Sequence, residues 1–399
     1  MFQWPIIVLI RKTWVLGAVI ALLILLIGAG SLKLNSVFSS DLTNKVIVID
    51  PGHGGADPGA QNSGLKEKDV NLDISLRLRK VLEAKGCNVI MTREVDMDFF
   101  RPGFYEGRMA KRAELNHRIN LATENNADLF ISVHTNSFPQ RNTYGMETYY
   151  HLKSATGKAL AELIQEQLTR LQSDNKRKAK AGDYYLINQT KMPAVIVEVG
   201  FISNPRERKQ LLSNDYRDLI AEAIGTGIDQ YFKEFPLGVR ENEQTVASQE
   251  GPPYVTEDTY KLYFLNSSLE SLVPEDRQIN RSVWTKQTLS QKASLVLGEL
   301  IQGPLLDTSV RTLAPKTKLL SLIIQNDIAT INFSKDIQAD FPGGVLEEDM
   351  IIKSIVWSMT QIPGINGVRI LINGEFGDSI GGHILLDHTF SAQPLKEVR

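Results

Sequence analysis

Four side chains that can bind a metal or transfer a proton stand beside apolar runs in this sequence. His53 follows the first such run through a Pro-Gly step, and His134 directly follows a later one. Glu198 interrupts a third run, where an uncompensated carboxylate is costly to bury. Glu67 stands where the first long helical pattern begins. Ligands bind beyond the carboxyl ends of strands in open α/β sheets, so this placement is typical of an active site.

These residue types predict a zinc hydrolase site. Two imidazoles and one carboxylate commonly hold a catalytic zinc ion and leave one position for water, whose pKa the metal lowers to about 7. A further carboxylate can act as general base and then protonate the leaving amine. We therefore predict that His53, Glu67 and His134 hold one Zn²⁺ and that Glu198 is the base. Each has a structural alternative: Glu67 as a helix N-terminal residue, His134 as a core histidine, Glu198 as the partner of a buried arginine.

The other histidines are expected to be structural or on the surface. His117 lies in a predicted helix and His151 just after a strand, whereas His383 and His388 have no carboxylate at ligand spacing. The one cysteine, Cys87, excludes an internal disulfide and a Cys-x-x-Cys site. The formal net charge of −2 gives no indication of a nucleic-acid partner.

Alternating strand and helix patterns position these residues. We predict strands at 45–50, 88–91, 128–133, 145–150 and 194–199 and helices at 69–85, 112–125, 155–171 and 216–232. This alternation favours an α/β domain over 45–234, with a mixed or parallel six-stranded twisted sheet and helices on both faces.

A polar segment at 235–256 reads as a linker to a second, small α+β domain at 257–390, before a tail at 391–399. Its expected elements are strands at 260–265, 319–325, 328–333 and 367–372 and helices at 289–300 and 345–360. The order β-α-β-β-α-β predicts a split βαβ arrangement.

The first 32 residues predict a membrane segment, followed by a tether at 33–44. Arg11 and Lys12 precede an uncharged apolar run at 14–30, close to the roughly 17–25 residues that span a bilayer as helix. A cleaved signal peptide is the alternative. Both interpretations place the rest of the chain outside the cytoplasm, anchored or exported.

The first domain resembles a known enzyme family. The segments VIVIDPGHGGADPGA, LKEKDVNLDISLRLRKVLEAKG, ADLFISVHTNS and MPAVIVEVGFISNP are similar to the zinc-dependent N-acetylmuramoyl-L-alanine amidases of the third amidase class, which includes spore-cortex and cell-division enzymes. The resemblance implies zinc ligands at His53, Glu67 and His134 and a catalytic Glu198. It implies peptidoglycan as substrate, cut between N-acetylmuramic acid and L-alanine. Asn136 and Arg118 are expected to contact substrate.

Some members of this family carry a helical plug before the catalytic glutamate strand. No counterpart is recognisable between Tyr150 and Met192, so we expect an uncovered site. Two other functions stay open on the residues alone. They are a zinc peptidase acting within the stem peptide and a wall-binding scaffold without turnover.

The second domain resembles the sporulation and germination domain known as GerMN, through YKLYFLN, LVLGELIQGP and SIVWSMTQIPGINGVRILING. It contains no recognisable catalytic set. The resemblance implies an interaction module, with an envelope or spore-assembly protein as a candidate partner.

Overall fold

The computed structural model describes residues 42–97, 99, 107–235, 259–267, 271–279, 281–338 and 344–392. The predicted membrane segment at 1–32 lies outside these residues, as do most of the tether, linker and tail. Within the described ranges, no helix is both long and apolar enough to cross a bilayer.

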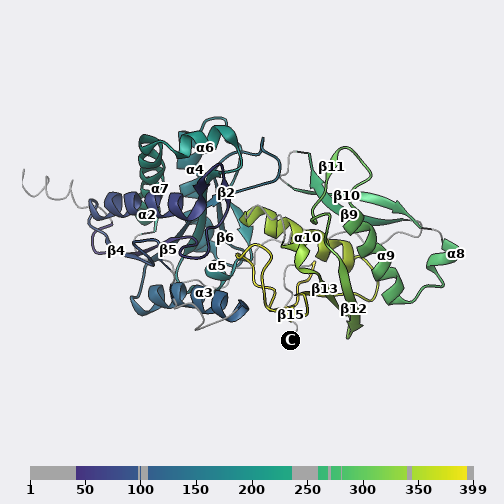
Figure 1. Cartoon of the computed structure of the whole chain (residues 1–399). Coiled ribbons are helices and arrows are strands. Elements are labelled where there is room, and N and C mark those ends of the chain that lie inside the picture. The colour runs from purple at the N-terminus through teal and green to yellow at the C-terminus, as the bar shows by residue number, and fades with distance from the viewer. Residues whose placement is uncertain are drawn as a thin grey trace, which may run out of the picture.

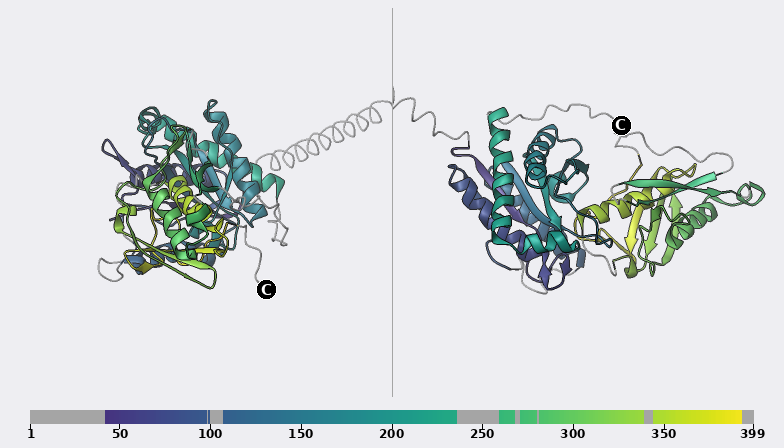
Figure 2. Two further views of the ribbon diagram at one scale, coloured as in Figure 1. Left: turned by 90° about the vertical axis from the view of Figure 1, so that its right-hand side faces the viewer. Right: turned by 90° about the horizontal axis from the view of Figure 1, so that it is seen from above.

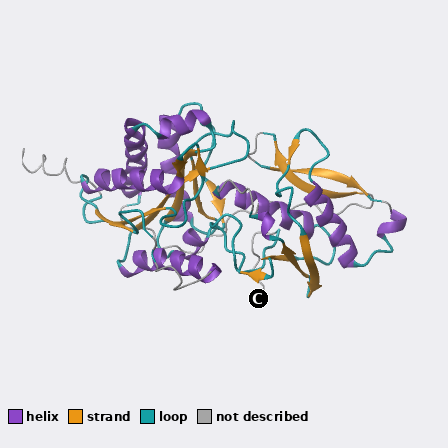
Figure 3. Cartoon of the chain, viewed as in Figure 1, coloured by secondary structure: helices purple, strands orange, loops and turns teal. Residues whose placement is uncertain are grey.

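The first domain is built on one six-stranded sheet with the strand order β4-β1-β5-β8-β6-β7 (Figures 1 and 3). Its strands are β1 (Val46–Pro51), β4 (Asn88–Met91), β5 (Leu129–Asn136), β6 (Glu147–His151), β7 (Lys180–Gly182) and β8 (Ala194–Phe201). β1 runs parallel to β4 and β5, and β5 parallel to β8, whereas β6 is antiparallel to β8. The predicted mixed six-stranded sheet is confirmed, although β7 had no sequence signal.

Helices cover both faces of this sheet. Side chains alternate between the faces of a strand. Ile47, Ile131 and Val197 therefore pack with α2 (Glu67–Glu83), α4 (Ala155–Leu171) and α7 (Asn214–Glu234). Val48, Phe130 and Ile196 face the other way, toward α3 (Gly107–Glu124) and α5 (Tyr185–Gln189). A hairpin of β2 (Gln61–Asn62) and β3 (Leu65–Lys66) leads into α2, and α6 (Pro205–Leu211) follows β8.

The second domain has two sheets within its described part, which corrects the predicted split βαβ arrangement. The first is β10-β9-β11 and the second β12-β13-β14-β15. The strands are β9 (Thr259–Asn266), β10 (Leu272–Gln278), β11 (Ser309–Val310), β12 (Leu319–Gln325), β13 (Ile328–Phe333), β14 (Gly367–Ile372) and β15 (Glu375–Phe376). The helices are α8 (Arg281–Trp284), α9 (Leu289–Gln302), α10 (Val345–Thr360) and the 3-10 turn η1 (Lys335–Ile337). β9 does not join β13 and β14 because β10 and β11 occupy its two edges.

The two domains pack against each other. One continuous cluster of buried apolar residues joins the α3 face of the first sheet to the core around α10. The beginning of α10 points toward the first domain in both the front view and the view from above (Figures 1 and 2). The face of the sheet that carries α3 and α5 is therefore also the face that receives the second domain.

Candidate active site

The fold brings the four predicted residues to one end of the sheet. His53 lies in the loop after β1, His134 and Glu198 lie near the ends of β5 and β8, and Glu67 begins α2. His134 and Glu198 are register partners on neighbouring parallel strands. Strand alternation places both on the α3 face.

Glu67 is the point on which the two histidines converge. Its Oε1 lies 3.2 Å from His53 Nε2 and 3.1 Å from His134 Nδ1. The two rings meet edge to face with centroids 5.0 Å apart. Gly59, with φ +62°, permits this approach, because a Cβ there would lie 2.6 Å from Glu67 Oε2 and 2.7 Å from the His53 ring. Two imidazoles and a carboxylate thus share one small volume.

The His53 backbone and ring are held by further groups. His53 has φ 60°, a left-handed conformation that is uncommon for a residue other than glycine, asparagine or aspartate. Its Nδ1 is 2.9 Å from Asp57 Oδ2, which also receives Lys111 Nζ at 2.9 Å. A carboxylate on Nδ1 fixes the tautomer and directs Nε2 toward Glu67. Asp57 was not singled out from the sequence, although a carboxylate four residues after a histidine is a usable signal.

The electrostatics of the two rings differ. Burial alone would lower the pKa of His53, but the carboxylates of Glu67 and Asp57 raise it to about 10. Burial lowers the pKa of His134 to about 4. Burial would raise the pKa of Glu67, yet the His53 charge and the hydrogen bond from His134 hold it well below its usual value. The Glu67 carboxylate thus raises the pKa of one ring, whereas burial lowers the pKa of the other.

Glu198 lies beside this group, and no salt bridge joins it to a cationic side chain among the described residues. It is 1% exposed, and its Oε2 has no hydrogen-bond partner in the described chain. Arg177, which could have paired with it, instead has its Nη1 3.1 Å from Glu147 Oε2. Burial and the nearby Glu67 charge raise the pKa of Glu198 well above its usual value. A buried carboxylate with a raised pKa is suited to accept and return a proton.

Arg118, predicted to contact substrate, is 2% exposed and bonded within the protein. Its Nη1 donates to Asp50 Oδ1 at 2.8 Å and to the Pro51 carbonyl at 3.1 Å, and its Nη2 donates to the His53 carbonyl at 3.0 Å. Asp50 is also the acceptor for the hydroxyls of Thr92 and Ser132. These contacts hold the loop that carries His53, and a contact with substrate stays a prediction.

Asn136, the other predicted substrate residue, ends β5 and is fully buried. Its Oδ1 accepts from the Ser137 amide at 2.9 Å, while its Nδ2 has no hydrogen-bond partner among the residues that the structure covers. Gly344 of the second domain lies against it, because a Cβ there would stand 2.3 Å from Asn136 Oδ1.

The residues present fit a zinc ion. His53 Nε2 is buried and makes no hydrogen bond within the described ranges, although Glu67 Oε1 is close to it. Glu67 Oε2 and Oε1 are oriented by the amides of Ala60 and Thr135, at 2.8 and 3.0 Å. An unsatisfied imidazole nitrogen beside an oriented carboxylate and a second imidazole is the donor set that zinc prefers.

His383 does not lie on the surface, and whether its role is structural stays untested. His383 is 8% exposed and offers a ring nitrogen that lies within 4.8 Å of ligand nitrogens of both His53 and His134. Its partners belong to another domain, so no spacing along the chain could reveal them. The usable signal was its setting, Gly381-Gly382-His383, which mirrors the glycine-rich loop around His53.

We expected no plug from the segment between Tyr150 and Met192, and the cover at the site instead comes from the second domain. A cavity beside the two histidines is lined by residues of both domains: His53, Lys111, Leu115, Arg118, His134, Tyr184, Leu186, Ile196, Gly382 and His383.

Comparison with known proteins separates the chain into the same two parts. The family described as N-acetylmuramoyl-L-alanine amidase matches residues 47–230, and the family described as sporulation and spore germination matches residues 261–378.

Individual relatives match the first domain. The germination-specific N-acetylmuramoyl-L-alanine amidase of Bacillus subtilis (strain 168) is 40% identical over 199 residues, which are 49% of this chain and 84% of that protein. The amidase LytC of the same strain is 36% identical over 207 residues, 51% of this chain and 39% of LytC. The solved structure of the CwlD amidase from Clostridioides difficile in complex with the GerS lipoprotein is 39% identical, with a TM-score of 0.47, and covers 48% of this chain and 100% of that one. The chain belongs to the N-acetylmuramoyl-L-alanine amidase family.

Proposed function

We propose that this amidase uses one zinc ion held by His53, Glu67 and His134, with Glu198 as general base, to release stem peptides from peptidoglycan. Family membership gives the reaction, hydrolysis of the amide between N-acetylmuramic acid and L-alanine in cell-wall remodelling or germination. The observation that carries the residue assignment is the approach of both imidazoles to one Glu67 oxygen, at 3.2 and 3.1 Å.

The side chains divide the work in this proposal. Zinc in such a set activates water for attack at neutral pH. Glu198 accepts the proton released as oxygen attacks the lactyl carbonyl, and then delivers it to the leaving nitrogen of L-alanine. Its raised pKa, caused by burial and by the Glu67 charge, keeps it able to do both. Asp57 orients the His53 ring through Nδ1.

Asp50 and Arg118 act on the loop rather than on the substrate. Arg118 donates to the carbonyls of Pro51 and His53, and Asp50 neutralises its charge. This supports a positioning role for both, in which the loop conformation brings the His53 Nε2 toward Glu67. Asn136, at the end of β5, is the better candidate for a substrate contact because its Nδ2 donor is unpaired within the described chain.

Cell-wall amidases of this type act outside the cytoplasm. The apolar run at 14–30, with Arg11 and Lys12 before it, supports export of the chain and its retention as a membrane anchor. The second domain, which matches the family described as sporulation and spore germination, supports a protein partner in the cell envelope.

The test measures zinc content and peptidoglycan digestion for the full chain and three variants. Glu198→Gln keeps its zinc and loses about 10²–10⁴-fold in rate, the usual contribution of a general acid–base group. His53→Ala binds zinc more weakly than wild type, because it lacks one of the proposed ligands. The matched control Glu162→Gln, at a side chain that is 59% exposed, changes neither quantity.

Mass spectrometry of the digest identifies the bond. Free stem peptides that begin with L-alanine are expected, and shortened stems would instead show a peptidase. A Glu198→Gln protein as active as wild type would remove Glu198 from its proposed role.

A further inference from the structure

The second domain places a third imidazole at the candidate metal site. The His383 ring centroid is 5.5 Å from that of His53 and 5.3 Å from that of His134, and both contacts are edge to face. Each of the three residues offers one nitrogen within 4.8 Å of the other two. All three are buried, although they come from two domains that are distant in sequence.

Glu348, in the first turn of α10, holds the His383 ring in a defined orientation. Its carboxylate accepts hydrogen bonds from the amides of Ile380, Gly381, His383 and Ile384, at 2.9, 2.8, 2.8 and 3.3 Å. His383 Nδ1 lies 3.1 Å from the same carboxylate. Because the Glu348 carboxylate is a hydrogen-bond acceptor, His383 Nδ1 is the donor in this contact. The other ring nitrogen, Nε2, then keeps its lone pair. A carboxylate on one nitrogen is the usual support of a histidine that ligates a metal through the other.

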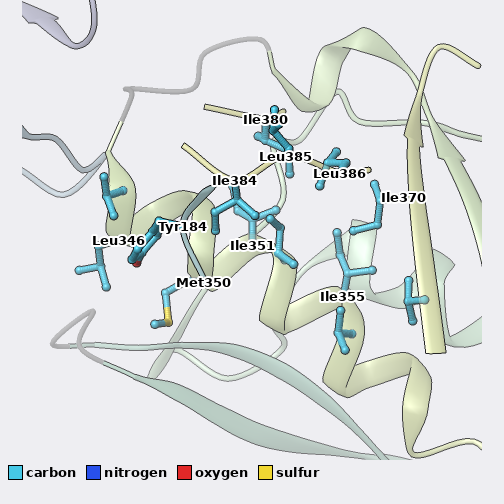
Figure 4. Close-up of a cluster of buried hydrophobic side chains, with 14 of the residues drawn as sticks. Tyr184, Leu346, Met350, Ile351, Ile355, Ile370, Ile380, Ile384, Leu385 and Leu386 are labelled. Atoms are coloured by element: carbon cyan, nitrogen blue, oxygen red, sulfur yellow. The ribbon is translucent and has the colours of Figure 1, made fainter. Parts of the chain in front are cut away.

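The surrounding contacts make this placement part of an interface. Figure 4 shows Tyr184 of the first domain among Leu346, Met350 and Ile384 of the second, and these residues belong to one buried apolar cluster. Tyr184 is fully buried. Burying such side chains removes apolar surface from water, so the apolar contact stabilises the docked arrangement.

Two further contacts flank the site. Gly344 approaches Asn136 so closely that only a residue without Cβ fits, and Arg112 Nη1 pairs with Asp387 Oδ2 at 2.9 Å. With the domain in place, His53 and His134 are 5% and 4% exposed and Glu198 is 1% exposed. Gly382 and His383 of the second domain line the cavity beside His53 and His134, so they occupy space that a substrate at the metal site would need.

We propose that the second domain closes the amidase site in the resting protein and that His383 enters as an additional metal ligand. This inference rests on the proposed metal site at His53, Glu67 and His134. A zinc ion with four protein ligands has the closed coordination of structural sites, whereas hydrolysis needs an open position. Turnover therefore requires that His383 withdraw from the metal and that the loop 380–384 leave the substrate-binding side.

The test uses the full zinc-loaded chain and two variants that act by different means. His383→Ala removes the additional ligand. Gly344→Ala keeps His383 but adds a methyl group 2.3 Å from Asn136 Oδ1, which disfavours docking. Gly298→Ala is the matched control, because a Cβ at Gly298 meets nothing within 4 Å. Two quantities are measured: the rate at which a chelator removes zinc and the rate of hydrolysis of a soluble muropeptide at saturating zinc.

Both variants are expected to hydrolyse the muropeptide about tenfold faster or more, as for a protein whose competent state is populated one-tenth of the time or less. His383→Ala should also release zinc about 10–100-fold faster, the range that follows loss of a group supporting the metal. Gly298→Ala should match wild type in both measurements.

Three results would overturn the inference. They are unchanged zinc release from His383→Ala, slower hydrolysis by His383→Ala at saturating zinc, and unchanged hydrolysis by Gly344→Ala. The double variant His53→Ala with His383→Ala distinguishes this failure from failure of the metal site itself, because it keeps only Glu67 and His134 of the proposed ligands. If the double variant keeps its zinc, the proposed function is wrong, whatever His383→Ala does alone.

Discussion

Replacing Asp50 by alanine tests whether a buried ion pair positions the His53 loop. Asp50 is fully buried, and its carboxylate accepts from Arg118 Nη1 at 2.8 Å, Thr92 Oγ1 at 2.6 Å and Ser132 Oγ at 2.7 Å. Removing one partner of a buried pair costs about 3–5 kcal/mol, because the other charge stays buried. Glu114 also pairs with Arg118 and would remain, so the expected loss is near 3 kcal/mol.

This loss converts into a measurable shift. For a domain of this size, 1 kcal/mol moves the unfolding midpoint by about 2–4 °C, so Asp50→Ala should lower Tm by about 6–12 °C. The matched control is Asp73→Ala. Asp73 pairs with Arg77 and Arg217 at 2.8 and 3.0 Å, but its side chain is 34% exposed. Such surface pairs contribute about 0–1 kcal/mol, which corresponds to a few degrees at most. Calorimetry of the full chain measures both shifts.

The pH dependence of the same pair has a definite sign. Burial would raise the pKa of Asp50, but Arg118 and the hydroxyls of Thr92 and Ser132 lower it below the free value of 3.8. A lowered folded pKa stabilises the protein above the free value, and this contribution is lost as the pH falls through the folded pKa. Asp50→Asn should therefore lose less stability on acidification than wild type. If Asp50→Ala and Asp73→Ala lower Tm equally, the ion pair is not what holds the loop.

Three further perturbations probe other parts of the structure. Arg112→Glu breaks the exposed pair with Asp387 and should speed muropeptide hydrolysis by up to about fivefold, the equivalent of 1 kcal/mol. The charge swap, Arg112→Glu together with Asp387→Arg, should restore the wild-type rate. If the double variant hydrolyses the muropeptide as fast as Arg112→Glu alone, the ion pair does not help to hold the second domain over the site. Gly59→Ala should weaken zinc binding in a chelator titration, because its Cβ would stand 2.6 Å from Glu67 Oε2. An unchanged zinc affinity would mean that the loop around residue 59 moves to accommodate the methyl group. Cys87 is 6% exposed, and burial raises its pKa to about 11. Its thiol should therefore react with a disulfide reagent at pH 8 only after unfolding in urea. Fast reaction of the folded chain would contradict its burial.

Strong periodicity explains which elements were predictable. The helix 155–171 and the strands 88–91 and 328–333 have their predicted bounds, because an amphipathic stripe or an apolar run decides them locally. β10 (Leu272–Gln278) was missed because it contains a proline and three charged residues, which an edge strand of a small sheet tolerates. β7 (Lys180–Gly182) is too short and polar to give a pattern.

The candidate site divides in the same way. His53, His134 and Glu198 could be found from the sequence because each stands next to a buried strand whose end is recognisable. Asp57 and Lys111, which orient His53, gave weaker signals because they lie in loop or helix positions where charged residues are common. His383 had only its glycine-rich setting as a signal, since only the docking of one domain on another brings it to the metal site.

The arrangement of the sheet links catalysis to this docking. Strand alternation puts His134 and Glu198 on the face of Phe130 and Ile196, which α3 and the five-residue α5 cover only in part. On the opposite face, three long helices complete the cover. The second domain supplies the missing cover on the catalytic face, so it and the substrate compete for the same surface. Opening the site exposes Tyr184 and its apolar neighbours to water, which costs free energy in proportion to the area. A ligand shifts the equilibrium between the docked and open forms only as far as it binds the open form more tightly than the docked form. The wall or a partner protein therefore has to contact the surface that the second domain uncovers.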